Sequence, residues 1–320
     1  GTTLLKPNGY SPDLKWEQTA TYNFAIDYGF LNNRINGSIE YYQKHTKDLL
    51  NTVSAPAGTN FTNQITANVG EMKNEGIEFN INAMAIQSKD FTWNVGYNIT
   101  WNDSKITKLT EYQGIDAGTN QKHQINEQPN TFYLFQQVYD KDGKAIQNAF
   151  VDRDGNGKIT EADRYLTGKS PMAKVFMGLS SEFTYRNWDL GFNLRANLGN
   201  YVFNSLASGN STTYNYSGKG FLVNYYEAIY KTGFTQINST EQGASDYFLE
   251  NASFLKMDNI TLGYSFKKLF TNRLSGRISA SVQNVFTITK YSGLDPETSA
   301  VDGSMWPRPR TFTLGINLNF

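Results

Sequence analysis

The sequence has no cysteine, few charged residues and no long apolar run. The absence of cysteine excludes disulfide scaffolds, thiolate metal sites and cysteine nucleophiles. Charged residues make up 18% of the chain, below the roughly 25% that is usual in soluble domains. The 29 Lys and Arg residues are matched by 29 Asp and Glu, which leaves no positive surplus for a nucleic-acid partner. Because no apolar run approaches the ~18 residues of a transmembrane helix, a helical membrane protein is also excluded.

Alternation of apolar and polar residues dominates what the 320 residues do contain. Near the C-terminal end, Phe312, Leu314 and Ile316 share one face of a strand, and Thr311 and Thr313 lie on the other. The pattern recurs and predicts nine strands, at about 16–30, 33–46, 70–87, 90–105, 174–186, 187–199, 253–267, 274–288 and 308–320. They run to ~9–14 residues, whereas globular strands average about 5–6 and a tilted membrane strand needs about 9–11. The sequence therefore predicts an all-β fold, a transmembrane antiparallel β-barrel with a polar lumen.

The connections between these strands alternate in length. Tight turns are expected near 31–34, 87–90, 186–187 and 268–273, and long outer loops at 47–69, 105–173, 200–252 and 289–307. Short periplasmic turns and long extracellular loops are typical of outer-membrane barrels. The apolar run Thr131–Tyr139 would break the up-and-down order as a tenth spanning strand, so we place it in an outer loop.

Nine is an odd number, and bacterial single-chain barrels have an even number of strands. An open sheet would also leave strand edges unpaired in lipid. We therefore expect residues 1–320 to be the C-terminal part of a larger barrel, and the absence of a signal peptide at Gly1 agrees with this. Two alternatives stay open: a passive porin, and a soluble or surface calcium-binding β-protein of the adhesin or lectin type.

Four stretches carry a resemblance to one family. They are Asp13–Thr19, Asn68–Glu78, Asn284–Phe286 followed by Tyr291–Glu297, and Pro309–Gly315. In this order they resemble the C-terminal half of SusC/RagA-type TonB-dependent outer-membrane transporters of Bacteroidetes, over nearly the whole chain.

The resemblance implies a barrel of about 22 strands, with a plug domain and a TonB box that are not in this chain. It implies import of oligosaccharides or peptides across the bacterial outer membrane, driven through TonB, together with a SusD-like surface lipoprotein. It suggests a dimer of transporter–lipoprotein pairs. It also implies that Phe320 belongs to the barrel-assembly signal, although a lipid-facing strand end would equally explain this residue.

The sharpest local motif resembles an EF-hand calcium loop. Its oxygen donors are Asp152, Asp154, Asn156, the Lys158 carbonyl, Thr160 and Asp163. Hard oxygen ligands suit Ca²⁺, and Gly157 permits the sharp turn that lets them converge. Asp163 replaces the usual glutamate, and its shorter side chain should weaken binding. We expect a structural Ca²⁺ that orders the long outer loop; the alternative is an Asx- and glycine-rich turn without an ion.

A second candidate site is aromatic. The loop 200–252 contains tyrosines that would stack on sugars or pack on peptide side chains, and the candidates for substrate or lid contact are Tyr214, Tyr216, Tyr225 and Tyr226. The alternative is that these rings form the core of the loop.

No catalytic pattern is present, and we expect that the protein is not an enzyme. The two histidines, His45 and His123, belong to no metal or triad motif. We expect both of them to be solvated.

Overall fold

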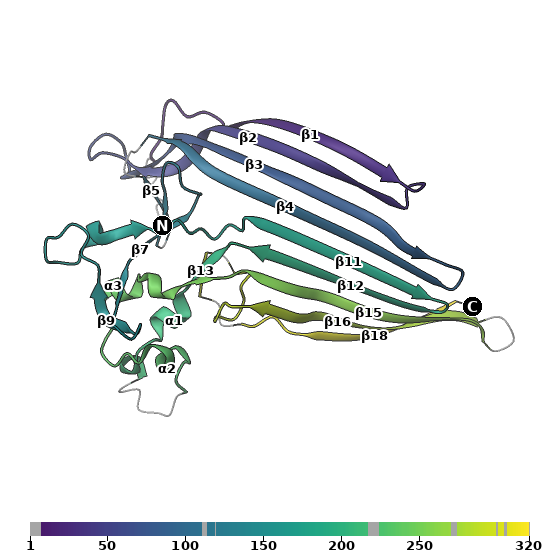
Figure 1. The fold of residues 1–320 in the computed structure, drawn as a ribbon. Helices are drawn as coiled ribbons and strands as arrows, with labels where there is room; N and C mark the ends of the chain where they lie inside the picture. The colour runs from purple at the N-terminus through teal and green to yellow at the C-terminus, as the bar shows by residue number, and fades with distance from the viewer. Residues whose placement is uncertain are drawn as a thin grey trace, which may run out of the picture.

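The computed structural model describes residues 8–110, 114–118, 120–216, 224–269, 274–298, 300–303 and 306–319. Across these ranges, nine long strands pair into one antiparallel sheet (Figure 1). In spatial order they are β1 (Gln18–Phe30), β2 (Ile35–Ser54), β3 (Gln64–Gln87), β4 (Phe91–Leu109), β11 (Val175–Tyr185), β12 (Trp188–Leu198), β15 (Phe254–Leu269), β16 (Leu274–Thr289) and β18 (Thr311–Asn319). The nine strands and their up-and-down order are those that the alternation predicts.

The loop boundaries differ from the prediction where strands extend beyond the alternating region. The segment 47–69 is not a loop throughout, because Leu49 pairs with Gly70 and the ladder continues to Ser54 and Gln64. The pairing register shifts on both sides of Leu49, and Asp48 has a φ of 56°. These bulges interrupt the period of two that the sequence pattern depends on, so the connecting loop is only residues 55–63. Similarly, β4 continues to Leu109.

Tight turns and long connections lie at opposite ends of the sheet (Figure 1). The turn 31–34 uses three consecutive residues with positive φ, Leu31, Asn32 and Asn33, and Arg186 adopts the same region in the two-residue turn before β12. Residues 270–273 lie outside the described ranges. This asymmetry is the one expected for a barrel with its turns in the periplasm.

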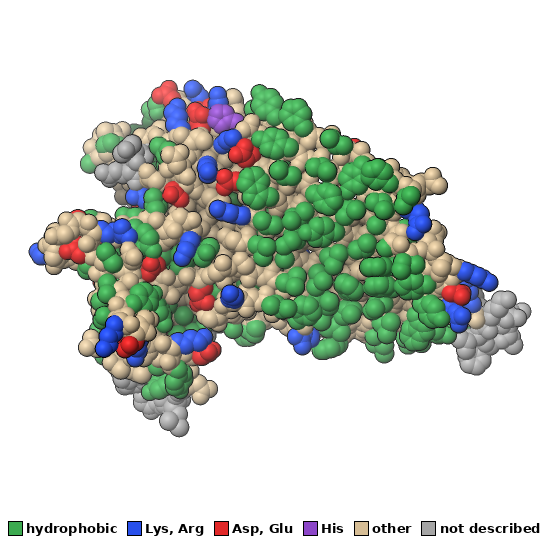
Figure 2. Space-filling model, in the orientation of Figure 1, with side chains coloured by type: hydrophobic (Ala, Val, Ile, Leu, Met, Phe, Trp, Pro, Cys, Tyr) green, Lys and Arg blue, Asp and Glu red, His purple; other side chains and the backbone are tan. Residues whose placement is uncertain are grey.

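One face of the sheet is a continuous apolar field (Figure 2). On edge strand β1, Phe24 is 69% exposed, and on edge strand β18, Leu314 is 72% exposed. Register places outward-facing residues side by side, as with Leu179 and Leu194. Near the turns the field is aromatic, since Trp188 lies 4.7 Å from Tyr264 between ring centroids. An apolar surface of this extent is unfavourable in water and matches the lipid-facing band of an outer-membrane barrel.

The opposite face, which we call the inner wall, is polar. Pairing across six strands aligns one row of small polar residues and glycine: Asn36, Asn82, Gly96, Ser180, Asn193 and Asn259. Asn193 and Asn259 are directly hydrogen-bonded, with 3.1 Å between the amide nitrogen and oxygen. Such a row suits a water-filled lumen.

The long connections fold into a separate layer at the loop end of the sheet (Figure 1). We call this layer the outer cap and define it as the described parts of 110–174, 199–253 and 290–310. Among the described residues, no helix is long and apolar enough to cross a membrane.

The elements of the outer cap are short. Its strands are β5 (Ile115–Gly118), β6 (Gln121–His123), β7 (Thr131–Phe135), β8 (Gln137–Tyr139), β9 (Ala145–Phe150), β10 (Arg164–Leu166), β13 (Tyr201–Asn204), β14 (Leu249–Asn251) and β17 (Val301–Asp302). Its helices are η1 (Glu161–Asp163), α1 (Ser205–Gly209), η2 (Thr213–Tyr216), α2 (Ala228–Thr232), α3 (Thr240–Gly243) and η3 (Asp246–Phe248). The run Thr131–Tyr139 forms β7 and β8 here, which confirms that it does not span the sheet.

The outer cap has its own hydrophobic core. Phe132 and Leu134 of β7 are fully buried against Phe203 and Phe248, which belong to a different connection. Burying each such side chain contributes about 1.5–3 kcal/mol. A buried polar contact joins the same two segments, since the Gln242 amide donates to the Gln137 side-chain oxygen at 2.9 Å. The connections therefore pack on one another as a unit.

Candidate functional site

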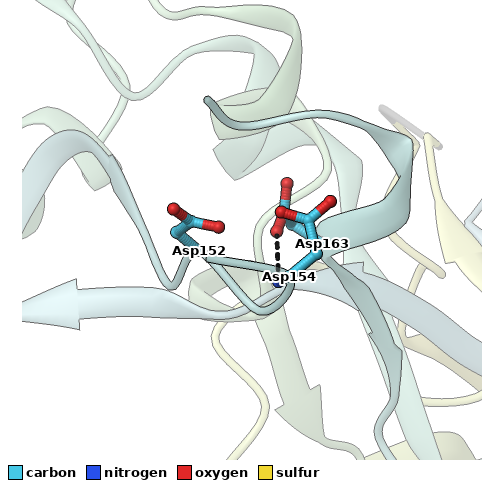
Figure 3. Close-up of side chains that lie close together, drawn as sticks. All are labelled: Asp152, Asp154 and Asp163. Atoms are coloured by element: carbon cyan, nitrogen blue, oxygen red, sulfur yellow. Dashed lines mark hydrogen bonds between the residues drawn. The ribbon is translucent and has the colours of Figure 1, made fainter. Parts of the chain in front are cut away.

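Three aspartates gather where the sequence predicts a calcium loop: Asp152 and Asp154 in the connection from β9 to η1, and Asp163 at the end of η1 (Figure 3). Carboxylate oxygens of Asp152, Asp154 and Asp163 all lie within 4.8 Å of one another. Asp154 is exposed, Asp152 is half-buried and Asp163 is fully buried. The structure thus brings together the three carboxylates of the motif, although they are up to eleven residues apart in the sequence.

Asp163 closes this loop from its buried end. One carboxylate oxygen accepts the Arg153 N–H at 2.7 Å, and the other accepts the Thr160 N–H at 2.7 Å. These backbone hydrogen bonds, from Thr160 first and then from Arg153, hold the pKa of Asp163 below its usual range. The side chain is therefore an anion at neutral pH despite its burial.

The exposed end of the loop is shaped by Asp152. Its two oxygens accept the N–H groups of Gly155 and Gly157, each at 2.8 Å. Both glycines have positive φ, 72° and 79°, a conformation that glycine adopts without strain. Asn156 donates to Asp154 at 2.7 Å. The turn chemistry alone therefore accounts for part of the folding of this loop.

Thr160 has a capping role. It is the N-cap of η1, and its hydroxyl accepts the Ala162 N–H at 3.3 Å while Asp163 completes a capping box. Next to it, the Arg153 guanidinium lies 4.4 Å from the centre of the Tyr165 ring. The Tyr165 hydroxyl donates to Asp246 at 2.6 Å, so the aspartate loop is tied to the connection that contains η3.

The candidate tyrosines occupy different environments. Tyr214, on η2, is 52% exposed and Tyr225 is 48% exposed. Tyr226 is half-buried, packs against the core of the outer cap and lines a cavity of about 480 Å³ together with Tyr247. The side chain of Tyr216 lies outside the described residues, as does Phe320, so both assignments stay predictions.

The histidines are not both solvated. His123 lies in β6 and is half-buried, with its ring nitrogen accepting the Asn130 N–H at 3.3 Å. Burial lowers its pKa, so the expectation of a solvated histidine is wrong for this residue, because the outer cap folds over it. His45, on β2, is partly exposed, with 3.1 Å between its ring nitrogen and Glu71.

An ionic cluster on the inner wall is a feature that the sequence reasoning missed. Arg195 of β12 and Lys256 of β15 are register neighbours. Both contact Glu297, which belongs to the connection after β16. In the sequence, the only indication of this cluster is that charged residues occupy the polar face of strands whose apolar and polar residues alternate.

Comparison with known proteins agrees with this architecture. The family model described as "TonB dependent receptor-like, beta-barrel" matches residues 2–285. The TonB-dependent receptor SusC of Bacteroides thetaiotaomicron is 46% identical over 98% of this chain and 33% of its own length. The TonB-dependent receptor P3 of Formosa agariphila is 28% identical over 96% of this chain and 34% of its own length.

A solved structure of the RagAB peptide transporter matches with a TM-score of 0.78 and 26% identity, covering 97% of this chain and 36% of that one. The chain thus spans about a third of the length of the relatives it matches. The family match, the polar inner wall and the apolar outer face together show that this chain belongs to the TonB-dependent receptor-like β-barrel family of the bacterial outer membrane.

Proposed function

We propose that the protein to which this chain belongs is a TonB-dependent nutrient importer of the SusC type. The observation that carries the proposal is the combination of a polar inner wall with a folded outer cap, in a chain that is 46% identical to SusC. In this proposal the chain supplies about nine strands of the barrel, part of the lumen surface and much of the outer mouth. The plug and the TonB contact belong to residues outside this chain.

The proposed transport cycle begins at the outer cap. A substrate binds at the mouth, a SusD-like surface lipoprotein closes over it, and TonB then displaces the plug so that the substrate moves along the polar wall. The RagAB structure is that of a peptide transporter, and the resemblance to SusC/RagA-type transporters implies oligosaccharides or peptides, so the proposal includes both substrate classes. A dimer of transporter–lipoprotein pairs is part of the same proposal.

The alternatives have less support. A soluble calcium-binding β-protein does not account for an apolar field across a whole sheet face. A passive porin does not account for the match to a TonB-dependent receptor family. We infer a transport function and no enzymatic one, because the family is one of receptors and transporters.

The import proposal is tested by purification and uptake. The protein is extracted from native membranes in detergent through an internal tag in an outer loop, and its partners are identified by mass spectrometry. Uptake of radiolabelled maltooligosaccharides and of peptides is then compared in cells with and without TonB. A co-purifying lipoprotein and TonB-dependent uptake of one class would support the proposal, and TonB-independent diffusion of both would contradict it.

We further propose that the tyrosines of the outer cap contact substrate or lid. Tyr226 is the strongest candidate because it lines the cavity beside Tyr247. Tyr226→Ala should weaken substrate binding, whereas Tyr139→Ala, at an exposed tyrosine of β8 that does not line this cavity, is a control that should not. Equal affinities in both variants would exclude Tyr226 from the site.

We also propose that the aspartate loop binds a structural Ca²⁺. Asp152 and Asp154 would be side-chain ligands with Asn156, and Lys158 would offer its carbonyl. Asp163 fits this site as the buried anion, although its oxygens already accept backbone N–H groups. Chelation should speed proteolysis between residues 140 and 170 and leave cleavage elsewhere unchanged. Calcium that fails to protect this region would contradict the proposal.

A further inference from the structure

The outward face of the sheet changes character at the loop end of β2, β3 and β4. Figure 2 shows basic, acidic and histidine side chains gathered there, where the apolar field ends. The last apolar row consists of three exposed register partners, Tyr41, Ile77 and Trp101. Tyrosine and tryptophan are enriched where a membrane-spanning surface meets the interface. This row therefore marks the outer edge of the lipid-facing band.

Charged side chains follow directly beyond this row on the same face. On β3 the alternation continues from Ile77 through Glu75 and Lys73 to Glu71, so these three side chains also point outward. Together with their neighbours on β2 and β4 they form a group that we call the outer belt, defined as His45, Lys47, Glu71, Lys73, Glu75, Asp103, Lys105 and Lys108. The outer belt is thus a continuation of the lipid-facing surface.

The outer belt lies at the level of lipid headgroups. Lys73 is four residues beyond Ile77 on β3, which is roughly 13 Å of strand at about 3.3 Å per residue. For a strand tilted by about 40°, this is roughly 10 Å along the membrane normal. The headgroup layer is about 5–8 Å thick on each side of a bilayer, and a lysine side chain can extend back toward it. The ammonium groups of the belt can therefore reach the headgroups.

The positive groups of the outer belt are its more exposed ones. In three ion pairs the lysine side chain is more exposed than the carboxylate: Lys108 (68%) with Glu71 (26%), Lys105 (57%) with Asp103 (19%), and Lys73 (39%) with Glu75 (30%). The carboxylates therefore lie closer to the sheet than their partners. With Lys47 the belt has four lysines against three carboxylates. The surface that a lipid would meet is positive.

A groove of about 500 Å³ opens within the outer belt. Lys73 and Lys108 line it together with His45 and Glu71, and Tyr22 of β1 lines its edge. The Glu71 carboxylate lies 3.1 Å from the His45 ring nitrogen and 3.5 Å from the Lys108 ammonium, so its charge is already paired. Each ammonium has three donors. An anion between Lys73 and Lys108 would therefore give each of them a second partner.

We propose that the outer belt binds a phosphorylated lipid of the outer leaflet, with its phosphate in the groove between Lys73 and Lys108 and its acyl chains on the apolar field. A lipid is favoured over a free phosphate because the groove is continuous with a surface that already faces acyl chains. Basic side chains at headgroup level attract anionic lipids. The proposal requires only the outer-membrane placement of the sheet and not import, so the two proposals can fail separately.

The test compares two lipids that differ in headgroup charge. The full-length protein is purified in detergent and titrated with phosphatidic acid, whose headgroup is a phosphate monoester, and bound lipid is counted by native mass spectrometry. Phosphatidylcholine, in which choline balances the phosphate charge, is the neutral comparison. Phosphatidic acid should bind more tightly, and an excess of inorganic phosphate should leave it bound.

The double variant Lys73→Gln and Lys108→Gln should lower the affinity for phosphatidic acid about 30-fold, because each lysine near an anionic lipid surface contributes about fivefold. The double variant Lys73→Arg and Lys108→Arg keeps both charges and should bind like the parent. If the glutamine double variant does not assemble, Lys108→Gln alone, at the more exposed lysine, should lower the affinity about fivefold.

The matched control removes two exposed lysines from the outer cap, Lys141→Gln with Lys144→Gln. These residues lie between β8 and β9, away from the apolar field, and their loss should leave the affinity for phosphatidic acid unchanged. Equal binding of the two lipids, an equal loss in this control, or displacement of the lipid by inorganic phosphate would overturn the proposal.

Discussion

Leu194→Arg places a charge on the apolar face near the middle of a spanning strand. Leu194 is the seventh of the eleven residues of β12, one residue from the midpoint, and it faces outward beside Leu179. An arginine on the lipid face costs about 2–4 kcal/mol at the bilayer midplane. Since about 1.4 kcal/mol is tenfold in an equilibrium constant, the equilibrium constant for folding should fall by ~30- to ~900-fold.

Asn193→Arg is the control at the same depth. Asn193 is the midpoint of β12, but its side chain bonds Asn259 on the inner wall, where an arginine stays in water. Both variants would be built in the full-length barrel and folded reversibly into phosphatidylcholine vesicles, with tryptophan fluorescence followed against denaturant. A cost below ~1 kcal/mol for Leu194→Arg, or an equal cost for Asn193→Arg, would refute the assignment of the two faces.

Three further predictions concern the outer cap and the ionic cluster at Glu297. Phe132→Ala should destabilise the cap by about 3–5 kcal/mol and speed hydrogen exchange of its amides, with β12 unchanged. Asp152→Asn should remove the calcium protection of residues 140–170 from protease. Burial alone would raise the folded pKa of Glu297, but hydrogen bonds from Arg195 and Lys256 lower it, so its stabilisation is present above its unfolded pKa and is lost as pH falls through the folded value; the free energy of unfolding of the outer cap should therefore be constant near neutral pH and fall only in acid.

Each of these has a result that would count against it. Amide hydrogen-exchange rates that are the same in Phe132→Ala as in the unmodified protein would mean that the hydrophobic core does not stabilise the outer cap. Protection by calcium that persists in Asp152→Asn would remove this carboxylate from the ion site. An outer cap that loses stability between pH 8 and pH 6 would point to a titrating group other than Glu297.

The sheet was largely predictable because strand alternation is a local property. The outward residues of β12 and β18 follow a period of two without interruption. Prediction failed where the period is broken, as at the bulge beside Leu49, since the paired strands continue although their sequence no longer alternates. A pattern within one strand does not reveal that its neighbour keeps pairing with it.

The outer cap and the ionic cluster could not be predicted in this way. Gln137 and Gln242 meet although they are 105 residues apart, and Glu297 reaches Arg195 on a strand from a different hairpin. Such contacts depend on which connections fold over the same end of the barrel. The aspartate loop was predictable in its residues, because its ligands are close in sequence, but the burial of Asp163 depends on the surrounding cap.

The shared core of the outer cap has a consequence for loop exchange between relatives. Phe132 and Leu134 come from one connection, Phe203 and Phe248 from the next, and Val301 from the last packs against them. A loop grafted alone from another receptor would bring half of an interface and leave the other half without a fitting partner. Chimaeras that alter specificity should therefore transfer residues 110–174, 199–253 and 290–310 as one block, and natural sequence changes in these segments should occur in compensating sets.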